Sequence, residues 1–126
     1  MNNIDDHKEI VKIRNELEEI KEEFYDHWHE DKEKYLKRVD VAIKNNALRA
    51  KIFLAIDGVR TAIEIENEIN SPHMSSWRAF KHLNKEGITR LLGSKGGSPV
   101  YCKKPWVKVL HIDDYVKEKY REILSP

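Results

Sequence analysis

The sequence predicts one mainly α-helical domain with a small β-hairpin, a long N-terminal helix and a C-terminal helix. Three observations carry this expectation. Apolar residues recur at helical spacing over most of the 126 residues, and residues 5–45 contain neither Gly nor Pro. A Gly-rich segment, Ser94–Pro99, separates two short β-prone runs. A chain of this length has room for one core and an appendage.

The N-terminal region, residues 1–44, is expected to be helical and to serve in dimerisation. Its apolar residues are spaced alternately by three and four positions, which marks one stripe of a helix; they are Ile10, Ile13, Leu17, Ile20 and Phe24. His27 and Asp31 interrupt the heptad pattern, so the segment is either one helix or two with a break near residues 29–31. The stripe needs a partner helix, from another subunit or from the C-terminal region.

Two shorter helices are expected next. A weak break at Asn45–Asn46 precedes an amphipathic helix that stops at Asp57–Gly58. Thr61 and Glu64 then have the spacing of a capping box, in which each side chain accepts from the other residue's backbone N–H. A short helix should therefore begin just after Thr61.

A third helix of this region should have Ser71 as its N-cap, Pro72 as its first residue and an end near Glu86, followed by Gly87 in the left-handed conformation. At 3.6 residues per turn one face of this helix should pack; its members are Ser76, Ala79, Phe80 and Leu83. The opposite face is mostly cationic; its members are Met74, Arg78, Lys81, His82 and Lys85.

The hairpin is expected to pair residues 88–93 with residues 100–104, with Ser94–Pro99 as its tip. Residues 106–112 are read as a further strand. Asp113 or Asp114 should cap a last helix, so residues 111–126 are assigned to a C-terminal helix that also takes part in dimerisation.

Residues 45–110 have the element order of a winged helix-turn-helix. Over about residues 47–104 the sequence resembles ArsR/MarR-type winged-helix transcriptional regulators. The resemblance rests on TAIEIENEI at residues 61–69 and on SSWRAFKHLNKEGI at residues 75–88. It implies that the second stretch is a recognition helix running into the first strand of the wing.

Charge is unevenly distributed, although the net charge is only +1. Residues 1–44 hold 9 Lys/Arg against 13 Asp/Glu, residues 45–110 hold 11 against 5, and residues 111–126 hold 3 against 4. A basic middle between acidic ends suggests that residues 45–110 bind a polyanion.

We therefore expect a sequence-specific transcriptional regulator that binds double-stranded DNA as a homodimer. The recognition helix would enter the major groove, and the wing would lie on the backbone or in the minor groove. The residues expected to contact DNA are Arg60, Ser75, Arg78, Lys81, His82, Lys85 and Lys95. Arg90, Lys103 and Lys104 could add backbone contacts, whereas Trp77, Tyr101 and Trp106 are expected in the core or at a subunit interface.

Other functions receive less support from the sequence. It contains no nucleotide-binding or hydrolase motif, so we expect no enzyme activity and no cofactor. His27 and Asp31 are the one helical pair in the HWHED segment, and no metal site is expected. Two alternatives remain open: a winged-helix module that binds proteins within a larger assembly, and a metal- or ligand-responsive repressor.

The expected location is the cytoplasm. The single cysteine, Cys102, cannot form an internal disulfide. We expect no membrane span, because the longest uncharged apolar run is residues 52–56, and no secretion signal, because the first residues are acidic.

Overall fold

The computed structural model describes residues 3–125, apart from the side chains of residues 3–6, 20–26 and 28. In chain order the elements are α1 (Asn3–Glu30), α2 (Lys32–Ile43), α3 (Ala47–Ala55), α4 (Ala62–Ile69), α5 (His73–Lys85), β1 (Thr89–Lys95), β2 (Ser98–Lys103), α6 (Pro105–Val109), α7 (Ile112–Lys119) and α8 (Arg121–Leu124). The chain is thus mainly helical with one two-stranded antiparallel sheet, as predicted.

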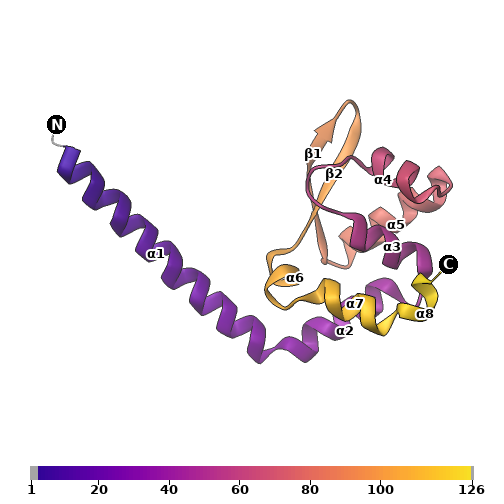
Figure 1. Cartoon of the computed structure of the whole chain (residues 1–126), viewed down its shortest axis with the longest axis horizontal. Coiled ribbons are helices and arrows are strands. Elements are labelled where there is room, and N and C mark those ends of the chain that lie inside the picture. Colours follow the sequence, from indigo (N-terminus) through magenta and orange to yellow (C-terminus); the bar gives the residue numbers. More distant parts are fainter. Residues whose placement is uncertain (1–2, 126) are drawn as a thin grey trace.

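Figure 1 shows two parts of different character. α1 projects outward as a long rod, and the remaining elements form a body, which we define as residues 32–125. The N-terminal region is two helices rather than one, because Asp31 at φ −98° and ψ 19° leaves the helical conformation. After this break α2 continues along the underside of the body, where it lies beside α7 (Figure 1).

One hydrophobic core holds the body together. Phe53 from α3 and Phe80 from α5 are fully buried, together with Ile43 from α2 and Ile112 from α7. The core therefore continues across residues 44 and 110, which the sequence suggested as segment boundaries. Full burial of one such side chain contributes about 1.5–3 kcal/mol.

The two helices before α5 begin as predicted. The Asn46 side chain accepts a hydrogen bond of 3.0 Å from the Arg49 N–H and starts α3. The Glu64 N–H donates to Thr61 Oγ1 at 3.2 Å, and the Thr61 N–H donates to Glu64 Oε1 at 3.1 Å. The capping box is confirmed, so the entry to α4 is fixed by its own sequence.

The start of α5 differs from the expectation. Pro72, not Ser71, is the residue before the helix, and no side chain caps it. The Ser71 hydroxyl is hydrogen-bonded to the Ser76 hydroxyl, which also donates to the Pro72 carbonyl at 3.0 Å. Ser71 is engaged in that contact and makes no capping bond. The predicted end is confirmed, with Gly87 at φ +79°.

The hairpin is longer and tighter than predicted. The strands continue to Lys95 and from Ser98, so the tip is the two-residue turn Gly96–Gly97 rather than a six-residue loop. Both glycines have the positive φ, +58° and +81°, that a type I′ turn requires. Thr61 forms an isolated antiparallel bridge with Val100, which joins the sheet to the start of α4.

Residues 105–109 form α6, so the further strand predicted over residues 106–112 is wrong. Pro105 is the reason: it lacks the N–H that a strand ladder needs and fits the first turn of a helix. The C-terminal helix begins at Ile112, with Asp113 and Asp114 in its first turn rather than as its cap.

A polar cluster centred on Asp40 fastens the C-terminal helix to α2. The Asp40 carboxylate accepts from the hydroxyls of Tyr115 at 2.9 Å and Tyr120 at 2.8 Å, and from Lys119 Nζ at 2.6 Å. Burial raises the pKa of Asp40, but the hydrogen bonds from Lys119 and the two tyrosines outweigh it, and the net pKa lies below its usual value. The folded chain thus favours the charged carboxylate.

Candidate nucleic-acid interface

α5 separates into the two faces that its sequence predicts. The buried face, Ser76, Ala79, Phe80 and Leu83, packs against the rest of the body, and Phe80 stacks on Tyr101 with ring centroids 5.3 Å apart. Arg78, Lys81 and Lys85 are exposed. We call these three residues the α5 cationic face. Because the opposite side is fixed in the core, this face has a defined orientation.

His82 does not share that exposure. Its side chain is half-buried, and its Nε2 atom is buried without a hydrogen-bond partner in the part of the chain that the structure describes. The expectation that His82 belongs to the exposed cationic face is therefore corrected. One residue before the buried Leu83, it lies at the edge of the packed face.

The three aromatic residues divide differently from the expectation. Tyr101 and Trp106 are 6% exposed and belong to the core, as predicted. Trp77 is 47% exposed and lies outside the core, so of its two predicted places only a subunit interface stays a prediction. Lys81 Nζ lies 5.4 Å from the centre of the Trp77 ring, which places a cation over an aromatic surface on the open side of α5.

Ser75 and Arg78 line one side of a hollow between α5 and α3. The cavity has a volume of about 290 Å³, and Asn46, Leu48 and Arg49 line its other side. Arg49 is a basic residue that the sequence argument missed, because it comes from a different helix. Its only signal in the sequence was the basic balance of residues 45–110.

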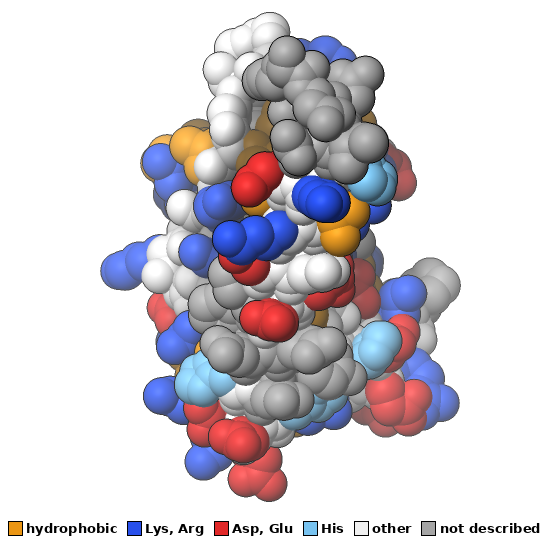
Figure 2. Space-filling view, turned by 90° about the vertical axis from the view of Figure 1, so that its left-hand side faces the viewer, with side chains coloured by type: hydrophobic (Ala, Val, Ile, Leu, Met, Phe, Trp, Pro, Cys, Tyr) orange, Lys and Arg blue, Asp and Glu red, His pale blue; other side chains and the backbone are white. Residues whose placement is uncertain are grey.

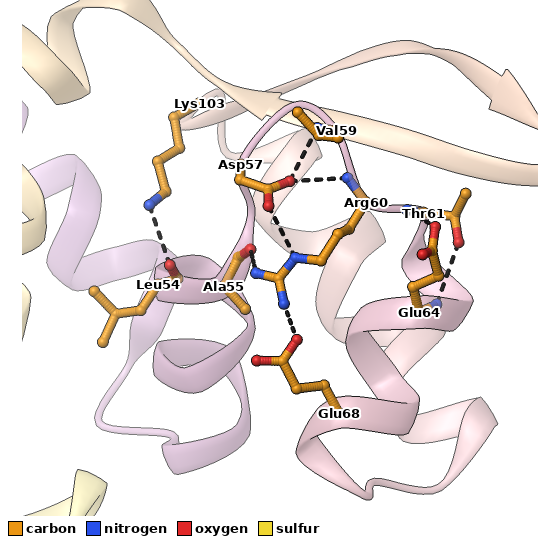
Figure 3. A network of polar contacts seen from close by, with 9 residues as sticks. All are labelled: Leu54, Ala55, Asp57, Val59, Arg60, Thr61, Glu64, Glu68 and Lys103. Carbon is orange, nitrogen blue, oxygen red and sulfur yellow. Dashed lines mark hydrogen bonds and ion pairs between the residues drawn. The ribbon is translucent and has the colours of Figure 1, made fainter.

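Arg60 is engaged within the chain, between α3 and α4 (Figure 3). Its Nε donates to Asp57 Oδ2 at 2.8 Å, one terminal nitrogen donates to the Ala55 carbonyl at 2.5 Å, and the other pairs with Glu68. All three guanidinium nitrogens thus have acceptors inside the body. A phosphate would have to displace one of them, so the predicted DNA contact of Arg60 has an internal competitor.

The same turn shows how strongly Arg60 is held. The Arg60 N–H donates to Asp57 Oδ1 at 2.9 Å, and the Val59 N–H donates to the same atom at 2.9 Å. These two backbone hydrogen bonds lower the pKa of Asp57 to about 2, and the one from Arg60 has the larger effect. The Asp57–Arg60 pair is therefore charged at any physiological pH and stabilises the connection between the two helices.

Lys95 lies at the end of β1, directly before the glycine turn, and is exposed. The Ile63 N–H donates to Ser98 Oγ at 3.2 Å, which ties this end of the hairpin to the first turn of α4. Hydrogen bonds from Thr61 lower the pKa of Glu64, and the charge of Lys95 adds to that effect. The cation at the tip thus lies on the side of the body where α4 begins.

The three other basic residues of the hairpin region are not equivalent. Arg90 is exposed and Lys104 is partly buried. The Lys103 side chain is only 7% exposed, and it donates to Asp113 Oδ2 at 2.7 Å and to the Leu54 carbonyl at 3.4 Å. Its ammonium group also lies 4.9 Å from the centre of the Phe53 ring. Lys103 serves the packing of the body, so the suggested backbone contact is corrected for this residue.

Neither a metal-binding cluster nor a membrane-spanning helix is found among the described residues. Within residues 3–125, apart from the undescribed side chains, no group of three or more His, Cys, Asp or Glu residues is placed to hold a metal ion. His27 and Asp31 form an i,i+4 pair at 3.7 Å. No helix in the described part of the chain is long and apolar enough to cross a bilayer.

Comparisons with known proteins do not assign the chain to a family. No family model matches it, and neither a curated protein nor a solved structure is similar to it at a significant level.

Proposed function

We propose that this chain is a winged helix-turn-helix regulator of transcription that binds double-stranded DNA in a sequence-specific way as a homodimer. In this proposal α3, α4 and α5 are the three helices of the domain, β1 and β2 are the wing, and the Thr61–Val100 bridge is the short third strand. α5 would enter the major groove, and the wing would lie along the backbone or in the minor groove.

The observation that carries the proposal is the α5 cationic face. Arg78, Lys81 and Lys85 stand on the exposed side of a helix whose other side is locked in the core by Phe80 and Leu83. A helix of this diameter fits the major groove, where an arginine can donate two hydrogen bonds to a guanine edge and lysines can meet phosphates.

Two neighbouring features extend the same surface. Ser75 lies beside Arg78 on α5, and Arg49 of α3 lies across the hollow from them, which adds a hydroxyl and a cation at one end of the helix. Lys95 stands at a tight glycine turn with no bulky side chain beside it, where a wing would approach a phosphate. Phosphate contacts of this kind fix the orientation of a protein on the duplex without reading its sequence.

Fluorescence anisotropy with a labelled duplex of random sequence tests the proposal. The logarithm of the binding constant should fall with the logarithm of the salt concentration, by about 0.9 per phosphate neutralised. Lys85→Ala should make that slope shallower by about one. Lys117→Ala is the matched control, because Lys117 is also an exposed lysine but lies on α7, and its loss should leave the slope unchanged. Binding of the wild type that does not respond to salt would contradict the proposal.

One observation favours a second function, a protein-binding module. Met74 and Trp77 expose large apolar surfaces on α5 itself. Trp77 also lines a mainly apolar cavity of about 330 Å³ between α4, α5 and the hairpin, with Ile63 and Pro99 on its other walls. Such a surface suits an apolar side chain of a partner protein. Trp77→Ala and Lys85→Ala are each compared with the wild type in the same salt titration. This separates the two functions, since only DNA binding should respond to the loss of Lys85.

A further inference from the structure

The N-terminal half of α1 exposes apolar side chains in a regular row. Every residue from His7 to Glu19 is exposed, and Ile10, Ile13 and Leu17 are 54%, 54% and 52% exposed. These three, which we call the α1 seam, are spaced by three and four positions and so share one face of the helix. The sequence repeats the spacing at Ile20 and Phe24, whose side chains lie outside the described residues.

The body does not cover the α1 seam. In Figure 1 α1 leaves the body as a straight rod, and it meets α6 and α2 toward its C-terminal end. Figure 2 looks at the side from which α1 projects and shows acidic and basic side chains intermixed there, with apolar ones between them. A helix of this kind gains its stability from packing its apolar face against a partner, because propensity alone is marginal in water.

The charges beside the seam indicate what the partner is. With Ile10 and Leu17 at position a and Ile13 at position d of a heptad, the g positions are all acidic; they are Glu9, Glu16 and Glu23. The e positions of the same two heptads are basic; they are Arg14 and Lys21. Glu9, Arg14 and Glu16 are exposed, and the side chains of Lys21 and Glu23 lie outside the described residues.

These charges distinguish the two possible orientations of a self-pair. In a parallel coiled coil a g residue faces the e residue five positions later on the partner, so Glu9 would meet Arg14 and Glu16 would meet Lys21. In an antiparallel pair g faces g and e faces e. That arrangement would set glutamates against glutamates and basic residues against basic residues, which is unfavourable.

We infer that the α1 seam packs against the α1 seam of another copy of this chain, with the helices parallel and in register. The inference rests on the self-association in the proposed function but not on its DNA contacts. The inference specifies the relative direction of the helices and not their number, because g–e pairing is the same in parallel coils of two or more helices. Isoleucine at d, as in Ile13, favours more than two helices, so the measured mass decides the number.

Parallel pairing has a geometric consequence. α1 has 28 residues and is therefore about 42 Å long at about 1.5 Å per residue. A parallel coil brings the bodies together at the C-terminal end of that rod, whereas an antiparallel pair would place them at opposite ends. Only the parallel arrangement brings the two bodies, each with its α5, to the same end of the coil.

A charge reversal tests the orientation. Glu16→Lys replaces an attraction by a repulsion at both symmetry-related Glu16–Lys21 contacts of a parallel pair, so association should weaken about tenfold. Adding Lys21→Glu to the same chain should restore it. Glu19→Lys, at position c, makes the same change of charge away from the interface and should alter association by less than about twofold. An antiparallel pair predicts that Glu16→Lys leaves association unchanged or strengthens it.

Disulfide trapping gives a second readout that does not depend on energies. In a Cys102→Ser background, Asp6→Cys places a thiol at position d near the N-terminal end of α1. Parallel helices bring the two thiols within bonding distance, so a linked pair should form in a glutathione redox buffer. In an antiparallel pair position d faces position a, so residue 6 lies near residue 24 of the partner and about 27 Å from its own equivalent. Asp6→Cys would then link only to Phe24→Cys in a mixture of the two variants.

Sedimentation equilibrium without DNA completes the experiment. A wild-type chain that is monomeric at tens of micromolar, or the mixed link between residues 6 and 24, would overturn the inference. Loss of DNA binding with an intact Asp6→Cys link would instead contradict the proposed function and leave the parallel pairing in place. Circular dichroism of each variant verifies that α1 remains helical.

Discussion

α1 and the body use the same kind of residue in opposite ways. Ile10 and Ile13 in α1 are half exposed, whereas Ile43 and Ile52 in the body are completely buried. Both sets sit on amphipathic helices, and both follow helical spacing. The difference is that the helices of the body have neighbours from the same chain, and the N-terminal half of α1 does not.

The comparison shows that a hydrophobic pattern specifies a face and leaves the partner of that face open. In the body, helices from distant parts of the sequence meet: α2 is joined to α7 through Asp40 and Tyr115. In the N-terminal half of α1 the apolar face is exposed to solvent, and only the charged residues beside it indicate which partner it binds. The body should therefore be stable by itself, and α1 should depend on association.

The largest expected effect is the loss of a core residue in the body. Phe80→Ala should lower the free energy of unfolding by about 3–5 kcal/mol, because it opens a cavity beside Tyr101. Lys81→Ala, on the next residue, should change it by less than about 0.5 kcal/mol. Urea denaturation followed by circular dichroism measures both, and the reverse order would show that the faces of α5 are wrongly assigned.

The next effect concerns the joint between α2 and the C-terminal helix. Asp40→Ala should lower the free energy of unfolding by about 1–3 kcal/mol at pH 7, because two tyrosine hydroxyls and Lys119 lose their acceptor. Asp114 is an exposed carboxylate on α7, so Asp114→Ala should have a much smaller effect.

The effect of Asp40→Ala on stability should depend on pH, and the sign of that dependence is defined. The pKa of Asp40 is lower in the folded chain than its ordinary value of 3.8. Its stabilisation is therefore complete above that ordinary value and is lost as the pH falls through the lowered one. The gap in unfolding free energy between wild type and Asp40→Ala should be widest at neutral pH and should shrink below about pH 4. A gap that widened in acid would contradict the sign.

Much of the body was predictable because its signals are local. The capping box at Thr61 and Glu64, the glycine that ends α5 and the packed face of α5 each depend on residues within a few positions of one another. The errors arose where tertiary contacts decide. Trp77 is a large aromatic residue, the type usually found in a core, yet it is 47% exposed. Lys103 is of a type usually found at the surface, yet its side chain is only 7% exposed and donates to Asp113.

The candidate site followed the same rule. The α5 cationic face could be derived from helical spacing alone. The place of Arg49 beside Arg78 needed the packing of α3 on α5, and the role of Arg60 needed the distance to Glu68. The DNA contacts themselves stay predictions.

A smaller effect separates residues that hold the body together from residues that face outward. Arg60→Ala should lower the free energy of unfolding by about 1 kcal/mol, because it removes the links to the Ala55 carbonyl and to Asp57. It should leave the salt slope of DNA binding unchanged. Lys95→Ala should do the opposite: unchanged stability, and a slope shallower by about one. An equal loss of slope in both variants would show that Arg60 reaches DNA despite its internal partners.

The smallest expected effect on stability gives the most direct test of the difference between α1 and the body. If the α1 seam matters only for association, Leu17→Ala should change the free energy of unfolding of the monomeric full chain by less than about 0.5 kcal/mol, since the Leu17 side chain is 52% exposed in the single chain. A wild-type chain that associates through α1 should melt at a temperature that rises with protein concentration, because association stabilises the folded state by mass action. In Leu17→Ala that rise should become much weaker, while the melting temperature at the lowest concentration should match the wild type. A lowered melting temperature at every concentration would mean instead that α1 stabilises its own body.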